Sequence, residues 1–181
     1  NRPAANEAGI GQAVGFTLGE QIYVGRGELA AGAGGARPHI SSRIRASLFW
    51  LGHEPLARRR EYIMKIGTAR AKMRVESIHR VIDASTLGAS DDAIEVRRHE
   101  VAECTIVCDR AVAFDAADSI ADTGRFVIVD RYEICGGGVI REALPDSQDV
   151  AREQVLLREH KWEPSFIAPG RRETRFGEGA K

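Results

Sequence analysis

The residues that could act as nucleophiles, bases or metal ligands are thinly spread along this sequence. No two histidines form a ligand pair on one short element, and no Gly-x-Ser-x-Gly nucleophile elbow is present. The carboxylate pairs Asp91 with Asp92 and Asp115 with Asp118 lie in polar segments, which favour solvated turns over paired acid and base chemistry. We therefore predict no catalytic residue, no cofactor-binding residue and no metal ligand in this chain. The histidines are His39, His53, His79, His99 and His160.

The chain has three cysteines, and two of them, Cys104 and Cys108, lie four residues apart in a segment that alternates like a strand. Together with Ile106 they would share one face, which favours buried small apolar residues over metal ligands. No second Cys or His pair follows at zinc spacing, and Cys135 stands alone. This pattern predicts neither a disulfide framework nor a closed zinc site, and it indicates a reducing compartment.

Three consecutive glycines at 136–138 invite comparison with a phosphate-binding loop. Such a loop needs Gly-Lys-Ser/Thr at the start of a helix, whereas residues 139–142 read Val-Ile-Arg-Glu. We interpret the run as a barrel corner, where glycine permits positive φ or the close approach of another backbone. In the strand expected over 125–134, the residues alternating onto the core face are Phe126, Ile128, Tyr132 and Ile134.

The composition is that of a soluble globular protein without a charge bias. The 26 Lys and Arg residues balance the 26 Asp and Glu residues among 181 residues, so bulk charge gives no reason to expect nucleic acid as a partner. No stretch approaches the ~18 uncharged apolar residues of a membrane helix, and the start shows no signal pattern. We expect a cytoplasmic fragment with no membrane partner.

The elements that would position these residues are predicted to be short strands. Near the start we expect strands at 12–18, 21–24 and 28–30, and the small residues at 30–38 predict a linker. The basic run at 58–60 is expected in a solvated turn. From residue 38 onward, alternation at barrel spacing predicts strands at 42–50, 61–66, 72–82, 95–107, 111–114, 125–134 and 139–142.

After Pro145 the pattern becomes helical. Residues 147–160 lack Gly and Pro and predict a short amphipathic helix. Trp162 and Phe166 follow it, and two sites remain open for them: the barrel or another domain.

Four segments, 13–28, 45–56, 80–85 and 99–105, resemble the two β-barrels behind the GTPase domain of the sulfate adenylyltransferase large subunit, a member of the translation-factor GTPase superfamily. Residues 152–164 resemble the connector in the version fused to an adenylylsulfate kinase. The resemblance implies a mainly β fold with two translation-factor-like antiparallel β-barrels, the first incomplete, and a short helical tail. We expect the C-terminal part of the first barrel with its linker at 1–37, the second barrel at 38–144, and a helical connector toward a kinase domain at 145–181.

The resemblance also implies a function. This region would be a non-catalytic scaffold for the GTPase domain of a sulfate-activating enzyme, which makes adenylylsulfate or phosphorylates it. The parent enzyme would use GTP, ATP and Mg²⁺. Its implied partners are the GTPase domain of the same chain, a kinase domain in cis and a separate small sulfurylase subunit. None of the family's nucleotide motifs occurs in this sequence, so no contact residue is transferred to it.

Two other function classes remain open. Similar barrels in elongation factor Tu hold aminoacyl-tRNA, so a translation-factor-like module that binds RNA or a protein partner is the alternative. The neutral charge and the lack of an aromatic and basic stripe make nucleic acid the less favoured partner. The third class is a purely structural domain whose nucleotide partner has decayed.

Overall fold

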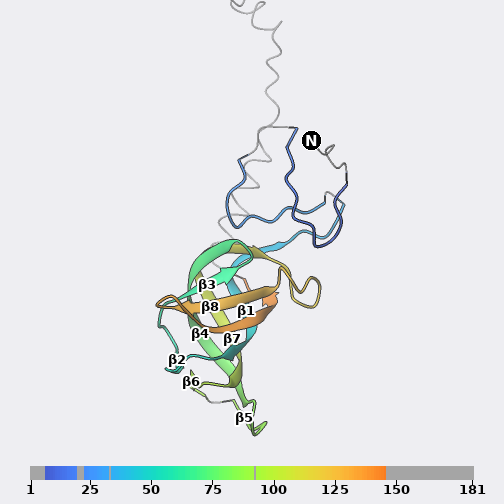
Figure 1. Ribbon diagram of the computed structural model, residues 1–181. Helices are drawn as coiled ribbons and strands as arrows, with labels where there is room; N and C mark the ends of the chain where they lie inside the picture. The colour runs from blue at the N-terminus through green and yellow to red at the C-terminus, as the bar shows by residue number, and fades with distance from the viewer. Residues whose placement is uncertain (1–6, 20–22, 33, 92, 146–181) are drawn as a thin grey trace, which may run out of the picture.

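The computed structural model describes residues 7–19, 23–32, 34–91 and 93–145 of the chain. Nine strands lie within these residues, and all of their pairings are antiparallel (Figure 1). No helix occurs among them, so no described helix could cross a membrane. The strands are β1 His39–Trp50, β2 Leu56–Ala57, β3 Tyr62–Ile66, β4 Ala69–Asp83, β5 Ala89–Ser90, β6 Glu95–Val96, β7 Glu100–Phe114, β8 Arg125–Asp130 and β9 Glu133–Ala143.

Six of these strands close into a barrel. Their order is β3-β8-β9-β1-β7-β4, and β3 pairs with β4 as well as with β8, which completes the ring. The short strand β5 extends β4, while β2 and β6 form a separate two-stranded pair. The mainly β fold expected from the sequence, with a translation-factor-like barrel, is confirmed. A closed ring gives every barrel strand two neighbours, which favours a rigid body.

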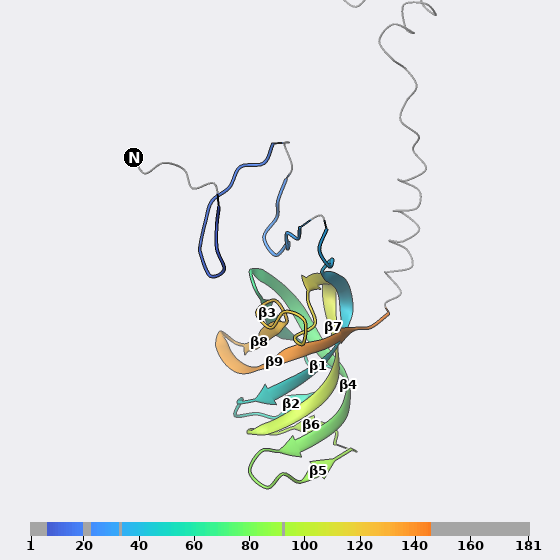
Figure 2. The same cartoon turned by 90° about the vertical axis from the view of Figure 1, so that its right-hand side faces the viewer.

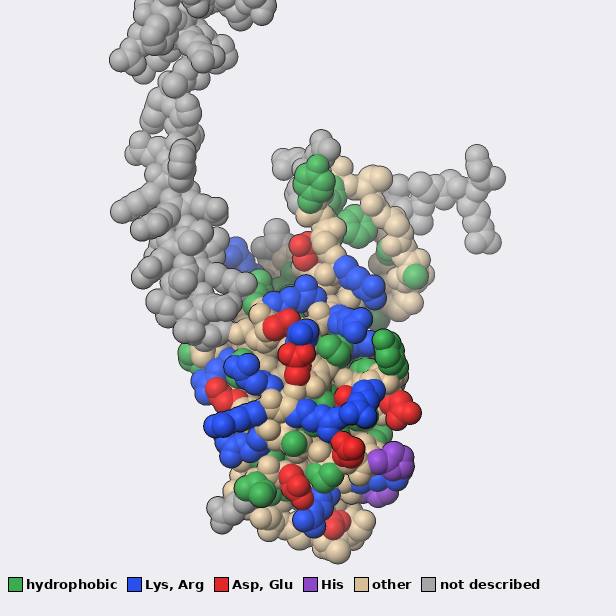
Figure 3. Space-filling view, turned by 90° about the vertical axis from the view of Figure 1, so that its left-hand side faces the viewer, with side chains coloured by type: hydrophobic (Ala, Val, Ile, Leu, Met, Phe, Trp, Pro, Cys, Tyr) green, Lys and Arg blue, Asp and Glu red, His purple; other side chains and the backbone are tan. Residues whose placement is uncertain are grey.

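The barrel core follows the alternation that the sequence predicts. On β1, Ile44, Ala46, Leu48 and Trp50 are each at most 2% exposed, as expected for the face they share. Burying a Leu or Ile side chain of this kind contributes about 1.5 to 3 kcal/mol, so such a row accounts for much of the barrel's cohesion. The outward positions carry charged side chains of both signs, which Figure 3 shows interspersed over one face of the molecule.

The hairpin between β8 and β9 differs from the prediction. The chain turns at Arg131 and Tyr132, which have φ of 46° and 77°, and Asp130 pairs with Glu133 across the turn. Positive φ at both central residues is the signature of a type I′ hairpin turn, whose twist matches that of the flanking strands. The expected single strand at 125–134 is therefore wrong. Tyr132 is fully exposed, because the chain reverses before it could reach the core face.

The three glycines lie inside β9 rather than at a corner. None of them has a φ in the left-handed region, and they pair with β1 on one side and with β8 on the other. A Cβ at Gly138 would lie 2.3 Å from the Ser47 carbonyl oxygen, and one at Gly136 would lie 2.8 Å from the Phe49 carbonyl oxygen. Close approach of a neighbouring backbone, which was one of the two uses expected of glycine, is the reason that these positions lack a side chain.

The segment before β1 lies against one end of the barrel (Figure 2). Its described residues form no strand, so the strands expected at 12–18 and 28–30 are not found, nor is one among the described residues of 21–24. Its apolar side chains are largely exposed, and its described residues pair with no strand of the sheets. The helix expected at 147–160, together with Trp162 and Phe166, lies outside the described residues.

The strand β7 is longer than expected. β7 runs unbroken through Glu100–Phe114, where the sequence predicts two strands, and it is separated from β6 by a turn that ends at His99 with φ of 70°. Cys104, Ile106 and Cys108 share the buried face of β7, as predicted.

Candidate functional site

The structure keeps the histidines apart. His39 opens β1, His53 lies in the loop after it, and His99 lies in the turn before β7; His160 lies outside the described residues. His79 on β4 shares a 2.8 Å hydrogen bond with the hydroxyl of Thr105. No group of three or more His, Cys, Asp or Glu side chains in the described part of the chain is arranged to hold a metal ion.

The two β7 cysteines are core residues. Cys104 and Cys108 are free thiols that face the barrel interior, and burial raises the pKa of each to about 12. A thiol with such a pKa is almost entirely protonated at neutral pH and is a poor nucleophile and metal ligand. Cys135 on β9 is half-buried and also free. The prediction of buried small apolar residues is confirmed for Cys104 and Cys108.

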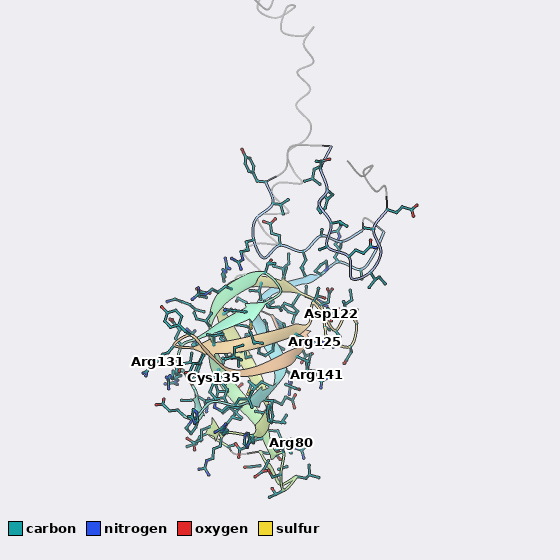
Figure 4. The ribbon with its side chains drawn as sticks, in the orientation of Figure 1. Arg80, Asp122, Arg125, Arg131, Cys135 and Arg141 are labelled. Atoms are coloured by element: carbon teal, nitrogen blue, oxygen red, sulfur yellow. The ribbon has the colours of Figure 1, made fainter. Side chains whose placement is uncertain are left out.

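The carboxylates singled out in the sequence take part in loop contacts. Asp115 accepts a 2.6 Å hydrogen bond from the Thr123 hydroxyl, and Asp118 lies 3.3 Å from the Arg141 guanidinium. Asp91 lies 3.6 Å from Arg80. Figure 4 shows Arg80 near one end of the barrel and Arg141 near its middle. Asp92 lies outside the described residues. The contacts of Asp91, Asp115 and Asp118 are turn and surface ion-pair chemistry.

The basic run at 58–60 contains a residue whose role the sequence did not reveal. Arg60 was expected in a solvated turn, but its guanidinium bridges two carboxylates, at 2.7 Å from Glu54 and 2.6 Å from Asp130. It also lies over the Tyr62 ring, 5.4 Å from the ring centroid. The planar guanidinium suits such a role, because its fork of donors can serve two acceptors at once. Asp130 lies seventy residues away in the chain, and no local pattern could have predicted this pairing.

Aromatic side chains support this junction, which consists of Glu54, Arg60 and Asp130. The Trp50 ring meets the Tyr62 ring edge-on with centroids 5.7 Å apart, and the indole N–H donates a 2.8 Å hydrogen bond to the Glu54 carbonyl. The Tyr62 hydroxyl accepts a 3.1 Å hydrogen bond from the backbone N–H of Ala57. These two hydrogen bonds fix the end of the loop after β1, and the strand β2 that follows it, to the barrel.

The electrostatics of the junction are those of an ion-paired anchor. The hydrogen bond from Arg60 holds the pKa of the Glu54 carboxyl below its ordinary value, and the bond to Glu54 in turn raises the pKa of Arg60. Burial raises the pKa of the Tyr62 hydroxyl. A hollow of about 160 Å³ lies beside these groups, with His53 and Cys135 in its lining. Both carboxylates already serve Arg60, so the arrangement positions loops and neither carboxylate is a free general base.

The same end of the barrel presents apolar side chains to solvent. Tyr132 in the hairpin turn and Ile134 on β9 are exposed, and so is Leu51, whose backbone N–H donates to the Cys135 carbonyl across the loop. Figure 4 shows Arg131 and Cys135 together at this end, on the side away from Arg141. Exposed apolar groups beside a fixed charged junction are typical of an interaction surface. This end of the barrel therefore offers an apolar surface for contact.

Comparison with known proteins shows the family to which this barrel is related. Residues 43–141 match the family described as GTP-eEF1A C-terminal domain-like. Sulfate adenylyltransferase subunit 1 of Tolumonas auensis is 33% identical over 136 residues, which cover 74% of this chain and 28% of that protein. The corresponding subunit of Shewanella woodyi is 30% identical over 180 residues, which cover 91% of this chain and 37% of that protein.

Two further relatives extend the picture. The bifunctional enzyme NodQ of Azospirillum brasilense is 28% identical over 153 residues, which cover 83% of this chain and 24% of that protein. The crystal structure of sup35 complexed with GDP superposes with a TM-score of 0.55 at 17% identity, covering 60% of this chain and 27% of that one, and this likeness concerns the fold alone. The chain thus spans between about a quarter and two fifths of the length of these curated relatives. It belongs to the GTP-eEF1A C-terminal domain-like family and is homologous to sulfate adenylyltransferase subunit 1.

Proposed function

We propose that this chain is the non-catalytic β-barrel region of a sulfate-activating enzyme and acts as a scaffold for its GTPase domain. The observation that carries the proposal is the homology to sulfate adenylyltransferase subunit 1 over 74% of the chain, combined with the family match over the barrel itself.

The physical basis of the scaffold is rigidity. A nucleotide domain that changes position on GTP hydrolysis needs a partner surface that does not deform, so that its contacts differ between the two states. The closed ring of six strands and the Arg60 junction supply such a surface.

The N-terminal segment is held against the barrel by specific hydrogen bonds. Arg26 donates a 2.9 Å hydrogen bond from Nε to the Thr68 carbonyl, and the Gly27 N–H donates a 3.0 Å bond to the Thr68 hydroxyl. Gly27 has φ of 99°, and a Cβ there would lie 2.9 Å from the Ala69 Cβ. The segment therefore depends on glycine to lie against the barrel, and it links the preceding chain to β3 and β4.

The wider assembly follows as part of the same proposal. The parent protein would use GTP, ATP and Mg²⁺ in the cytoplasm, with a GTPase domain and a kinase domain in the same chain and a small sulfurylase subunit as partner. The chain would divide into the end of a first barrel with its linker at 1–37, a second barrel at 38–144 and a connector at 145–181. NodQ, named as a bifunctional enzyme, supports the fused arrangement.

The test of the enzymatic context is an activity measurement on the full-length protein. Purified protein, with any co-purifying subunit, is incubated with ATP, Mg²⁺ and radiolabelled sulfate, with and without GTP, and adenylylsulfate is separated chromatographically. We expect adenylylsulfate formation that GTP stimulates. Absence of adenylylsulfate under all conditions, in a preparation that hydrolyses GTP and contains the small sulfurylase subunit, would rule out adenylylsulfate formation as the parent activity.

The scaffold role needs a separate readout. The full-length Gly138→Ala variant should bind GTP but lose GTP stimulation of sulfate activation, because its Cβ would push β9 away from β1. The matched control is Gly137→Ala, whose Cβ meets only ordinary or slightly tight contacts. If Gly138→Ala leaves GTP stimulation intact while it destabilises the barrel, the barrel is not the body against which the GTPase domain works.

A further inference from the structure

A basic hollow lies between the N-terminal segment and one end of the barrel, and neither the Arg60 junction nor the proposed function uses it. Its volume is about 730 Å³, and it is bounded by Arg26 of the N-terminal segment, the β3–β4 hairpin, and Asp109 and Arg110 of β7. Figure 3 shows positively charged side chains across the barrel beneath the N-terminal segment. The charged lining residues are Arg26, Lys65, Arg70, Lys72, Arg110 and a single carboxylate, Asp109.

The arrangement of these charges costs stability. Lys65 and Arg70 are register partners across β3 and β4, and both are exposed on the outer face of the barrel. Like charges directly opposite each other on a sheet are destabilising. Lys72, the next outward residue on β4, shows the usual solution, because it forms a 2.9 Å ion pair with Glu61 that raises its pKa. Four cations of the hollow have no carboxylate partner within the described part of the chain: Arg26, Lys65, Arg70 and Arg110.

Two of these cations are held in place without being neutralised. Arg26 donates to the Thr68 carbonyl at 2.9 Å, and the Arg110 guanidinium donates to the Arg70 carbonyl. A hydrogen bond to a neutral carbonyl fixes a guanidinium but leaves its charge and its other N–H donors available. The single carboxylate of the lining, Asp109, accepts a 3.0 Å hydrogen bond from the Lys72 backbone N–H, which holds it in place and leaves its charge. The hollow is therefore a positioned group of five cations that share one carboxylate.

The shape and lining select the class of ligand. The volume lies within the range of about 300 to 1,000 Å³ typical of small-molecule sites. Guanidinium groups match the oxygens of phosphate in a bidentate manner. The lining contains no aromatic ring on which a nucleobase could stack, which disfavours single-stranded nucleic acid. We propose that this hollow binds the polyphosphate group of a small molecule, and that the ligand bridges the N-terminal segment and the barrel.

The bridging follows from where the cations come from. Arg26 belongs to the N-terminal segment, whereas Lys65, Arg70 and Arg110 belong to the barrel. A ligand that contacts both parts binds the seated arrangement and stabilises it by mass action. Binding should therefore protect the segment from proteolysis. This inference does not depend on the parent protein activating sulfate.

The test is a calorimetric titration of the 181-residue chain with inorganic tripolyphosphate at low and at physiological salt. The test variant is the double substitution Lys65→Gln with Arg70→Gln. The control is Arg80→Gln with Arg98→Gln, which removes the same charge; Figure 4 shows Arg80 at the far end of the barrel. We expect the test variant to weaken binding at least tenfold and the control to change it less than twofold. Because the substitution removes a like-charge pair, the test variant should remain as stable to urea as the parent, so that lost binding is not lost folding.

Further arms identify the source of the polyphosphate. GTP or ATP binding at least tenfold more tightly than tripolyphosphate would indicate a nucleotide, whereas equal binding would indicate that only the phosphates are recognised. The variant Arg26→Gln should weaken binding and abolish ligand protection of the N-terminal segment from chymotrypsin, which can cleave after Tyr23 and leaves position 26 out of the readout. No measurable tripolyphosphate binding, equal loss in the control, or tighter binding of single-stranded RNA than of tripolyphosphate would each overturn the proposal.

Discussion

The close approach of β1 to β9 predicts that Gly138 does not tolerate a side chain, whereas the neighbouring Gly137 does. A Cβ at Gly138 would lie 2.3 Å from the Ser47 carbonyl oxygen and 2.9 Å from the Leu48 Cα, both of which are backbone atoms of β1. Ordinary contact begins near 3.4 Å, so β9 or β1 must move by about 1 Å. That movement cannot be absorbed by a rotamer change. It acts where Gly138 and Leu48 are register partners, and it therefore opens the β1–β9 ladder.

The magnitude follows from three contributions. Overpacking of a tight interior costs about 1 to 3 kcal/mol, and each ladder hydrogen bond that is lost costs about 0.5 to 1.5 kcal/mol. Alanine restricts the unfolded chain and returns only about 0.4 to 1 kcal/mol. We expect Gly138→Ala to lower the free energy of unfolding by about 3 kcal/mol. Gly137→Ala, whose Cβ would lie 3.1 Å from the Phe126 carbonyl oxygen, should stay within about 1 kcal/mol of the parent.

The assay is urea unfolding of both variants, followed by tryptophan fluorescence and circular dichroism. Agreement between the two probes supports a two-state analysis. The reasoning fails if Gly138→Ala unfolds at the same urea concentration as the parent chain. It also fails if Gly137→Ala loses as much stability as Gly138→Ala, because the cost would then come from strand glycine in general and not from the approach of β1.

Three other predictions test the charges, the thiols and the N-terminal seat. Arg60→Gln removes the cation that lowers the pKa of Glu54. A carboxyl whose pKa is lowered in the folded state contributes stability that is lost as pH falls, so the free energy of unfolding in urea should decrease less between about pH 6 and about pH 3 in the variant than in the parent. An equal decrease in both proteins would contradict the anchoring role of Arg60. Burial raises the pKa of Cys104 to about 12; its contribution to stability should fall as pH rises from about 9 to about 12, and a thiol reagent near neutral pH should label Cys135 first. Gly27→Ala should speed proteolysis within 23–32 without moving the urea midpoint of the barrel, and unchanged proteolysis would show that positive φ is not needed there.

The sequence predicted the parts of the barrel whose cause is local. Alternation alone placed Ile44, Leu48 and Trp50 on one face, and the same period placed Cys104 and Cys108 in the core. It did not predict the β8–β9 turn, because Arg131 and Tyr132 adopt positive φ without the Gly or Asn that usually marks such a turn. The three consecutive glycines led to the prediction of a barrel corner, but they lie within β9. Glycine is needed there because of the close approach of β1, a strand about ninety residues earlier in the chain.

The charged features were beyond sequence reasoning for a related reason. The Arg60 junction joins side chains seventy residues apart, so the basic run at 58–60 looked like a solvated turn. Equal numbers of acidic and basic residues gave no reason to expect nucleic acid as a partner, but net charge describes a composition and not the distribution of charge on a surface. Strand pairing brings Lys65 opposite Arg70, and the N-terminal segment adds Arg26 to the same hollow. Because screening confines each charge to about 8 to 10 Å at ordinary salt, a ligand in the hollow responds to these neighbours and not to the carboxylates on the far side of the barrel.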